Sequence, residues 1–210
     1  MNDDLQFLVH FFNDRAHLFK TMTMVDPCQF DEISDQIAAQ QGWYWFRYRQ
    51  SDRRDYLARR LFVEKQLYDG YTKEYGHLKE KVPVYFYIYP KVTPEKLVEL
   101  GERRSESYVA KPHILMIQIE DLEDTRNVTF TLNDSFAAFW KKAIDAGIKC
   151  RVEENCRAVL PDHNRVFPFS MIEEIHRKYQ AQEISYEVQI WDYALLEKIR
   201  YTILGEEETV

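Results

Sequence analysis

Several features are scarce in this chain of 210 residues, and each scarcity excludes a class of protein. The chain contains 6 glycines and 7 prolines, too few for a fibrous or low-complexity protein. It has 3 cysteines, and an odd number in a chain of this length is typical of a reduced intracellular protein. Cys150 and Cys156 have no second pair of ligands beside them, so we expect no metal site.

Long apolar runs and an excess of basic residues are also missing. No run is long enough to span a bilayer, and the acidic start MNDD lacks the basic region of a signal peptide. We therefore expect a cytoplasmic protein with no membrane partner. The net charge of −7 argues against a nucleic-acid-binding protein with a large basic face. One arginine-rich stretch, residues 47–60 beside the aromatic residues 43–48, either forms a solvated helix face or binds single-stranded nucleic acid.

Aromatic residues are plentiful, since 13 Phe, 14 Tyr and 4 Trp make up 15% of the chain, and they indicate a globular protein with one good core. The pattern predicts helices over 31–40, 52–75, 94–100, 133–146, 170–180 and 194–200. It predicts strands over 82–89, 113–119, 128–132 and 184–191, and either a strand or a short helix over 5–12.

The irregular order of these elements predicts an α+β fold with a mixed, mostly antiparallel sheet and flanking helices. No linker divides the chain, so we expect a single globular domain over residues 1–204, followed by an acidic tail at 205–210. No glycine-rich βα turn is present, which argues against a Rossmann unit.

Three predicted helices begin at residues suited to capping. Asp52 precedes the second helix, and Ser170 with Glu173 forms a capping box for the fifth. Asn133 is expected to cap the fourth helix, with Ser135 as the other capping candidate there, and this polar helix start also suits an anion.

The helix over 52–75 carries a charged pair within its predicted apolar stripe. Arg60 and Glu64 are four residues apart, so their side chains can meet, and they share the stripe with Leu57, Leu61, Leu67, Tyr68 and Tyr71. Charges in such a stripe must be satisfied. The pair is either a structural ion pair that fixes the position of the helix, or an arginine presented to a ligand and held by Glu64.

Two strands alternate in a way that assigns their faces. In 82–89, Tyr85, Tyr87 and Tyr89 share one face and form an aromatic wall that either lines a pocket or packs under a helix. In 184–191, Glu187 shares a face with Gln189. A glutamate within a strand either faces solvent or is a catalytic carboxylate in a cleft.

The order of these motifs resembles an uncharacterised bacterial family with the pattern RRxxxE, PxYF, DSF and YExQxW, over roughly residues 50 to 200. A more distant similarity is to the DarT-type DNA ADP-ribosyltransferases and the wider ADP-ribosyltransferase fold. It rests on an N-terminal segment with His10, on Arg60 or Arg59 early in a helix, on a strand of the type VPxYF and on a glutamate in a late strand. His10 taken alone, among apolar neighbours, is more typical of a core histidine.

This similarity implies NAD as the cofactor and two catalytic residues. Glu187 would hydrogen-bond the nicotinamide ribose and stabilise an oxocarbenium-like transition state, and Arg60 would orient the cofactor or assist proton transfer. The residues that we expect to bind the cofactor are His10, Glu64, Tyr85, Tyr87, Asn133, Ser135 and Gln189.

A second function stays open, that of a non-catalytic interaction domain. In this alternative the surplus aromatic residues form an exposed patch through which the chain makes a homo-oligomer. The sequence therefore leaves an ADP-ribosyltransferase-like enzyme with a small-molecule ligand and an interaction domain as the two main hypotheses.

Overall fold

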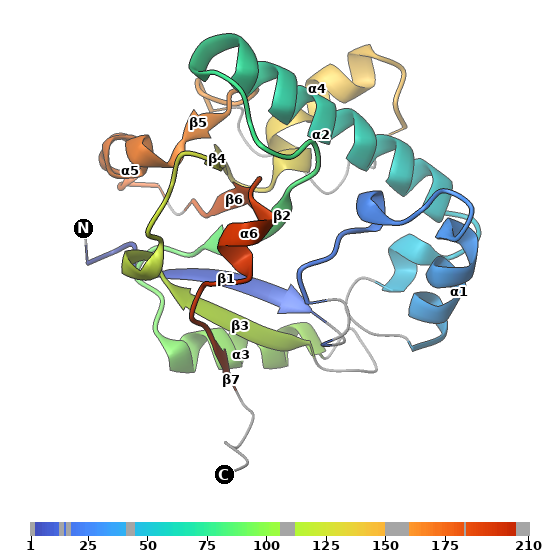
Figure 1. Ribbon diagram of the computed structural model, residues 1–210, viewed down its shortest axis with the longest axis horizontal. Coiled ribbons are helices and arrows are strands. Elements are labelled where there is room, and N and C mark those ends of the chain that lie inside the picture. The colour runs from blue at the N-terminus through green and yellow to red at the C-terminus, as the bar shows by residue number, and fades with distance from the viewer. Residues whose placement is uncertain are drawn as a thin grey trace.

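The computed structural model describes residues 3–12, 15, 18–40, 45–105, 112–149, 160–182 and 184–204. The fold is α+β, a single domain built on an open antiparallel sheet (Figure 1). Its strands are β1 Phe7–Phe12, β2 Val84–Ile88, β3 His113–Gln118, β4 Val128–Leu132, β5 Phe167–Pro168, β6 Tyr186–Ile190 and β7 Thr202–Leu204. Its α-helices are α1 Phe30–Gln40, α2 Arg53–Tyr75, α3 Pro94–Ser105, α4 Ser135–Asp145, α5 Ile172–Tyr179 and α6 Tyr193–Leu196.

The strand order is β5-β4-β6-β2-β1-β3-β7, and all six neighbouring strand pairs are antiparallel. The predicted α+β class and antiparallel preference are therefore confirmed. The predicted strands agree with β2, β3, β4 and β6 to within two residues at either end, and of the two alternatives for residues 5–12 the strand is found, over Phe7–Phe12. The strands β5 and β7 were not predicted, because segments of 2 and 3 residues carry no alternation.

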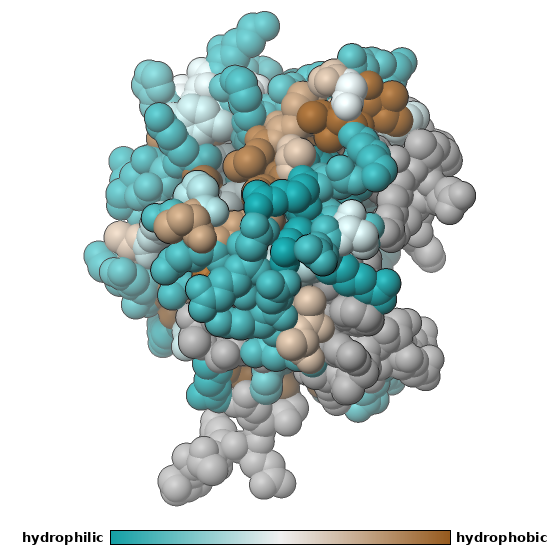
Figure 2. Space-filling view, turned by 90° about the vertical axis from the view of Figure 1, so that its right-hand side faces the viewer, coloured by the Kyte–Doolittle hydropathy of each residue, from teal (hydrophilic) through white to brown (hydrophobic). Residues whose placement is uncertain are grey.

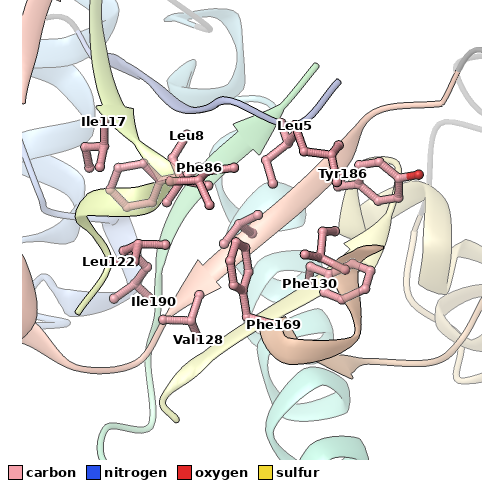
Figure 3. Packing of buried hydrophobic residues seen from close by; sticks show 14 of the residues in the cluster. Leu5, Leu8, Phe86, Ile117, Leu122, Val128, Phe130, Phe169, Tyr186 and Ile190 are labelled. Atoms are coloured by element: carbon pink, nitrogen blue, oxygen red, sulfur yellow. The ribbon is translucent and has the colours of Figure 1, made fainter. Parts of the chain in front are cut away.

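The sheet has two different faces. One face, here called the apolar face, bears the even-numbered residues of β2, β4 and β6 and packs against α5 and the segment that contains α6. Figure 3 shows its closely packed side chains, among them Leu8, Phe86, Phe130 and Tyr186. Such packing of a strand's buried side against helices is what an α+β domain requires.

The other face, here called the mixed face, bears the odd-numbered residues of the same three strands. Apolar side chains of α2 and α4 cover one part of it, and Leu97 of α3 covers the part formed by β1 and β3. In Figure 1, α2 and α4 accordingly lie together at one end of the molecule and α3 at the other. Between these two apolar contacts lies a band of polar residues, which is described below.

Three helix caps differ from prediction. Asp52 precedes α2 but its side chain makes no capping hydrogen bond, and its carboxylate instead accepts from Ser51. The cap of α4 is Asp134, whose carboxylate accepts from the Phe136 amide at 2.7 Å, because Asn133 has a left-handed backbone with φ of 57°. The fifth helix begins as a 3₁₀ turn at Phe169–Met171, and no side chain caps its α-helical part.

The buried stripe of α2 also differs from prediction. Leu61 was expected in it, but 49% of this residue is exposed. The buried side of the helix consists of Arg53, Arg60, Val63, Glu64, Leu67 and Tyr71. The prediction that Arg60 and Glu64 lie within the buried stripe is therefore confirmed, while Leu61 lies outside it.

Within the described residues, no helix has both the length and the apolar composition needed to cross a membrane.

Candidate functional site

The polar band of the mixed face is centred on β6. Glu187 and Gln189 are completely buried, so of the two alternatives left open by the sequence the solvent-facing one is wrong. Glu187 lies between Tyr87 of β2 and Thr131 of β4 in the sheet register. Side chains at such paired positions lie next to one another on one face, so the register itself places these groups together.

Hydrogen bonds connect this band along the sheet. The Gln189 amide donates to the Glu187 carboxylate at 3.3 Å and to the Glu187 carbonyl at 3.0 Å. Its own oxygen accepts from Thr129, which in turn accepts from the Trp191 indole at 2.9 Å. Tyr87 donates to the other Glu187 oxygen at 3.3 Å. A buried network in which each member has partners rigidifies the groups that it holds.

The Glu187 carboxyl has a pKa close to neutral pH. Burial raises the pKa of its carboxyl, the nearby Asp134 charge raises it further, and Arg60, Ser135 and Gln189 lower it, so the pKa is about 7. A carboxyl with a pKa near the working pH can exchange a proton during a reaction. Buried groups with such values and specific charged neighbours are candidates for a functional site.

Arg60 lies between two aromatic rings next to this carboxyl. Its guanidinium carbon is 4.2 Å from the centroid of the Tyr85 ring and 4.1 Å from that of the Phe136 ring. Its Nη1 contacts the Ser135 hydroxyl at 3.5 Å, and the same hydroxyl hydrogen-bonds Glu187. Burial opposes the charge of Arg60, but the neighbouring phenols and carboxyls outweigh burial and raise its pKa. Arg60 therefore holds a permanent positive charge beside Glu187.

Glu64 is the second buried carboxyl near Arg60. Its Oε1 accepts from Thr23 at 2.8 Å and from the Tyr85 hydroxyl at 3.1 Å. Its Oε2 has no hydrogen-bond partner among the described residues. Burial raises the pKa of Glu64, and the Arg60 charge lowers it. The charges of Arg60 and Glu64 thus act on one another, as the spacing predicts, while the guanidinium is held by the two rings.

The structure separates His10 from this cluster. Its neighbours along β1 alternate, so its ring lies on the apolar face, where its centroid is 5.2 Å from that of Phe86. Its Nδ1 donates to the Tyr85 carbonyl at 2.7 Å. Burial lowers the pKa of His10. His10 is therefore a predicted site residue that lies on the opposite face of the sheet from Glu187.

The remaining predicted site residues lie around Glu187. The backbone carbonyl of Asn133 accepts a hydrogen bond from the backbone amide of Glu187 at 3.3 Å, so the backbone of Asn133 contributes to the cluster. Tyr87 and Asn133 are both partly exposed, as is Asp134. Tyr87 also stacks on Tyr89 with a ring-centroid distance of 6.0 Å. The cluster therefore reaches the surface beside Glu187, at a pair of tyrosine rings and a helix start.

Several members of the cluster were not predicted from the sequence. Thr129 and Thr131 could have been found, since they alternate with apolar residues on a short strand in the same way as Glu187 and Gln189. Thr23 and Phe136 give no such signal, because only the tertiary fold brings them to Glu64 and Arg60.

The exposed aromatic patch expected for an interaction domain is not seen in the described residues. Their exposed large hydrophobic residues are Leu61, Ile144 and Tyr201. The face drawn in Figure 2 is mainly hydrophilic, with hydrophobic atoms gathered toward its upper edge. The predicted cluster 43–48 falls partly outside the described residues, as do Cys150, Cys156 and the acidic tail 205–210. In the described part of the chain, no three His, Cys, Asp or Glu residues are grouped to hold a metal ion.

Comparison with known proteins gives no match, since no family model, no curated protein and no solved structure is similar to this chain.

Proposed function

We propose that the protein is an NAD-dependent, ADP-ribosyltransferase-like enzyme with Glu187 and Arg60 as its catalytic residues. The observation that carries the proposal is their convergence on Ser135. Arg60 contacts the Ser135 hydroxyl, which also hydrogen-bonds Glu187, and the charges of Glu187 and Arg60 influence one another. The two residues come from α2 and β6, so the fold rather than local sequence brings them together.

The chemistry that suits this pair is cleavage of the glycosidic bond between nicotinamide and ribose. The bond from C1′ to the pyridinium nitrogen breaks, and nicotinamide leaves with the electron pair. The ionised Glu187 carboxylate stabilises the positive charge that develops on the ribose. Water or an acceptor hydroxyl then attacks C1′, and Glu187, with its pKa of about 7, accepts the proton that the nucleophile loses.

Other residues in the cluster have supporting roles in this proposal. Gln189 and Tyr87 each donate a hydrogen bond to one oxygen of Glu187, which fixes the orientation of the carboxylate. The stacked Tyr87 and Tyr89 rings, both partly exposed, offer a flat surface for the pyridine ring next to Glu187.

Release of nicotinamide from NAD, followed by chromatography, tests the proposal. We expect Glu187→Gln to lower the rate at least about 100-fold, since it removes the negative charge that stabilises the positive charge developing on the ribose. Glu120→Gln, which changes an exposed glutamate on a 3₁₀ turn, should leave the rate unchanged. The wild-type rate should rise with pH through about 7 as Glu187 ionises. Equal rates for the wild type and Glu187→Gln, or no nicotinamide release from the wild type, would contradict the proposal.

A further inference from the structure

Glu64 is a buried carboxyl to which the proposed reaction assigns no role. It is 3% exposed and follows Arg60 by four residues on the buried side of α2. Its Oε1 accepts hydrogen bonds from Thr23 and Tyr85, whereas its Oε2 has no hydrogen-bond partner among the described residues. A buried carboxyl oxygen without a partner is unfavourable, so the stability of the fold does not account for a glutamate at this position.

A series of contacts connects Glu64 to Glu187. The Tyr85 hydroxyl donates to Glu64 at 3.1 Å, and the centroid of the same ring is 4.2 Å from the Arg60 guanidinium carbon. Arg60 in turn contacts the Ser135 hydroxyl at 3.5 Å, and this hydroxyl hydrogen-bonds Glu187. The contacts lead from α2 to β2, back to α2, and through the start of α4 to β6. The two carboxyls therefore lie on opposite ends of one buried chain of contacts that passes through a single guanidinium.

The two carboxyls also share the charge of that guanidinium. Burial raises the pKa of Glu64 and that of Glu187, and the Arg60 charge lowers both. Burial opposes the ionisation of Glu64, whereas burial and the Asp134 charge both oppose the ionisation of Glu187. We therefore expect Glu64 to ionise first as the pH rises. Glu187 then ionises beside a guanidinium whose charge is already partly balanced, which is less favourable.

The tyrosines around the two carboxyls do not account for a change of charge near pH 7. Tyr85 and Tyr87 of β2 donate hydrogen bonds to Glu64 and Glu187, respectively. A phenol ordinarily has a pKa of about 10. Burial raises the pKa of Tyr85 further, and it also raises the pKa of Tyr193 in α6, to which the Glu64 charge contributes. The groups whose charges act on one another near neutral pH are therefore the two glutamates.

We infer that Glu64 is a positioning residue of the proposed reaction, and that it acts on Glu187 through Arg60. The two carboxyls compete for one guanidinium, which is held by the two aromatic rings between which it lies. The inference rests on the proposed function, because it concerns the ionisation of the same catalytic carboxyl. While Glu64 is ionised, Glu187 is a weaker acid and keeps its proton to a higher pH, so its carboxylate is a better proton acceptor.

Carbon-13 NMR of the glutamate carboxyl groups, followed from pH 4 to pH 9, tests the inference without relying on activity. The Glu187 signal is the one that is absent from Glu187→Gln. In Glu64→Gln the amide oxygen can still accept from Thr23 and Tyr85, but the charge is removed. We expect the titration midpoint of Glu187 to fall from about 7 by about half a pH unit or more in this variant.

Three further variants separate the charge of Glu64 from its packing. Glu74→Gln is the matched control, since Glu74 lies on the same helix with a side chain that is 53% exposed, and the Glu187 midpoint should not move. Glu64→Asp keeps the charge, so the midpoint should stay near that of the wild type. Glu64→Met removes the charge and fills the site with an apolar side chain, so it should lower the midpoint as Glu64→Gln does and decides the matter if Glu64→Gln does not fold.

Two outcomes would overturn the inference. One is a Glu187 midpoint that stays at the wild-type value or rises in the folded variants without the Glu64 charge, and the other is an equal fall in Glu74→Gln. Nicotinamide release then separates the inference from the proposed function. In Glu64→Gln the rise of the rate with pH should move to lower pH by the same interval as the NMR midpoint. If the midpoint falls but the wild type releases no nicotinamide, the reaction is wrong and the coupling of the two carboxyls stands.

Discussion

The two faces of β6 are both buried, yet they consist of opposite kinds of residues. Tyr186, Val188 and Ile190 lie in a continuous apolar cluster on one face. Glu187 and Gln189 lie on the other face and are equally inaccessible to solvent. Alternation along a strand therefore separates its two faces, but it does not reveal whether the polar face is exposed to solvent or buried.

The comparison matters because the two faces contribute differently to the free energy of folding. Burying an apolar side chain stabilises the fold by about 1.5 to 3 kcal/mol. Burying a polar group stabilises little even when it is hydrogen-bonded, and burying a charge is unfavourable unless it is paired. A fold that keeps Glu187, Arg60 and Glu64 buried together retains groups that stability alone does not favour. We take this as support for a chemical role of the mixed face.

The largest effect is expected on the apolar face. Phe130 is fully buried against Phe167 and Tyr186, with centroid distances of 5.4 and 5.8 Å. Phe130→Ala should lower the free energy of unfolding, measured with urea, by about 3 to 5 kcal/mol, since it leaves a cavity.

The matched change on the same strand is Thr131→Val, on the mixed face. Thr131 donates to the Asn133 carbonyl at 3.3 Å and accepts from Gln189 at 3.4 Å. We expect this variant to lose only about 1 kcal/mol, since its shape is kept and two weak hydrogen bonds are removed. Equal losses for Phe130→Ala and Thr131→Val would remove the distinction between the faces.

The second prediction concerns pH and is smaller. In the folded protein Glu187 has a pKa of about 7, above the ordinary value of 4.5. Below that ordinary value the Glu187 carboxyl is protonated in both the folded and the unfolded state. The stabilisation that its raised pKa gives to the folded state is then fully present. Between it and about 7 only the folded state keeps the proton, and the free energy of unfolding falls as pH rises. The total loss is about 3 kcal/mol.

Urea unfolding at pH 5 and pH 8 measures this effect. The wild type should lose more stability over this interval than Glu187→Gln does, because glutamine does not titrate. Other titrating groups, such as His10, are common to both proteins, so their contributions cancel in the difference. If the stability of the wild type and of Glu187→Gln depends on pH in the same way, the pKa of Glu187 is not raised in the folded protein. The proposed reaction then loses the proton acceptor with a pKa near 7.

Much of the fold follows from the sequence, and the reasons for the differences are physical. Alternation located β2, β4 and β6 and placed Glu187 on the face of Gln189. The helix cap was displaced by one residue, because Asn133 and Asp134 are both capable caps and only the left-handed φ of Asn133 distinguishes them. The sheet order and the approach of Phe136 to Arg60 depend on long-range packing, which no local pattern reports.

The smallest effect is predicted where sequence and structure disagree about α2. The apolar stripe expected from the sequence contains both Leu61 and Leu67, but the structure buries Leu67 completely and leaves Leu61 half-exposed. Leu67→Ala should therefore destabilise by about 2 to 5 kcal/mol, and Leu61→Ala by less than about 0.5 kcal/mol. Both substitutions preserve helix propensity, so the contrast reports burial alone. A large loss for Leu61→Ala would show that Leu61 is buried, and would contradict the orientation of α2 on which the contacts of Arg60 and Glu64 depend.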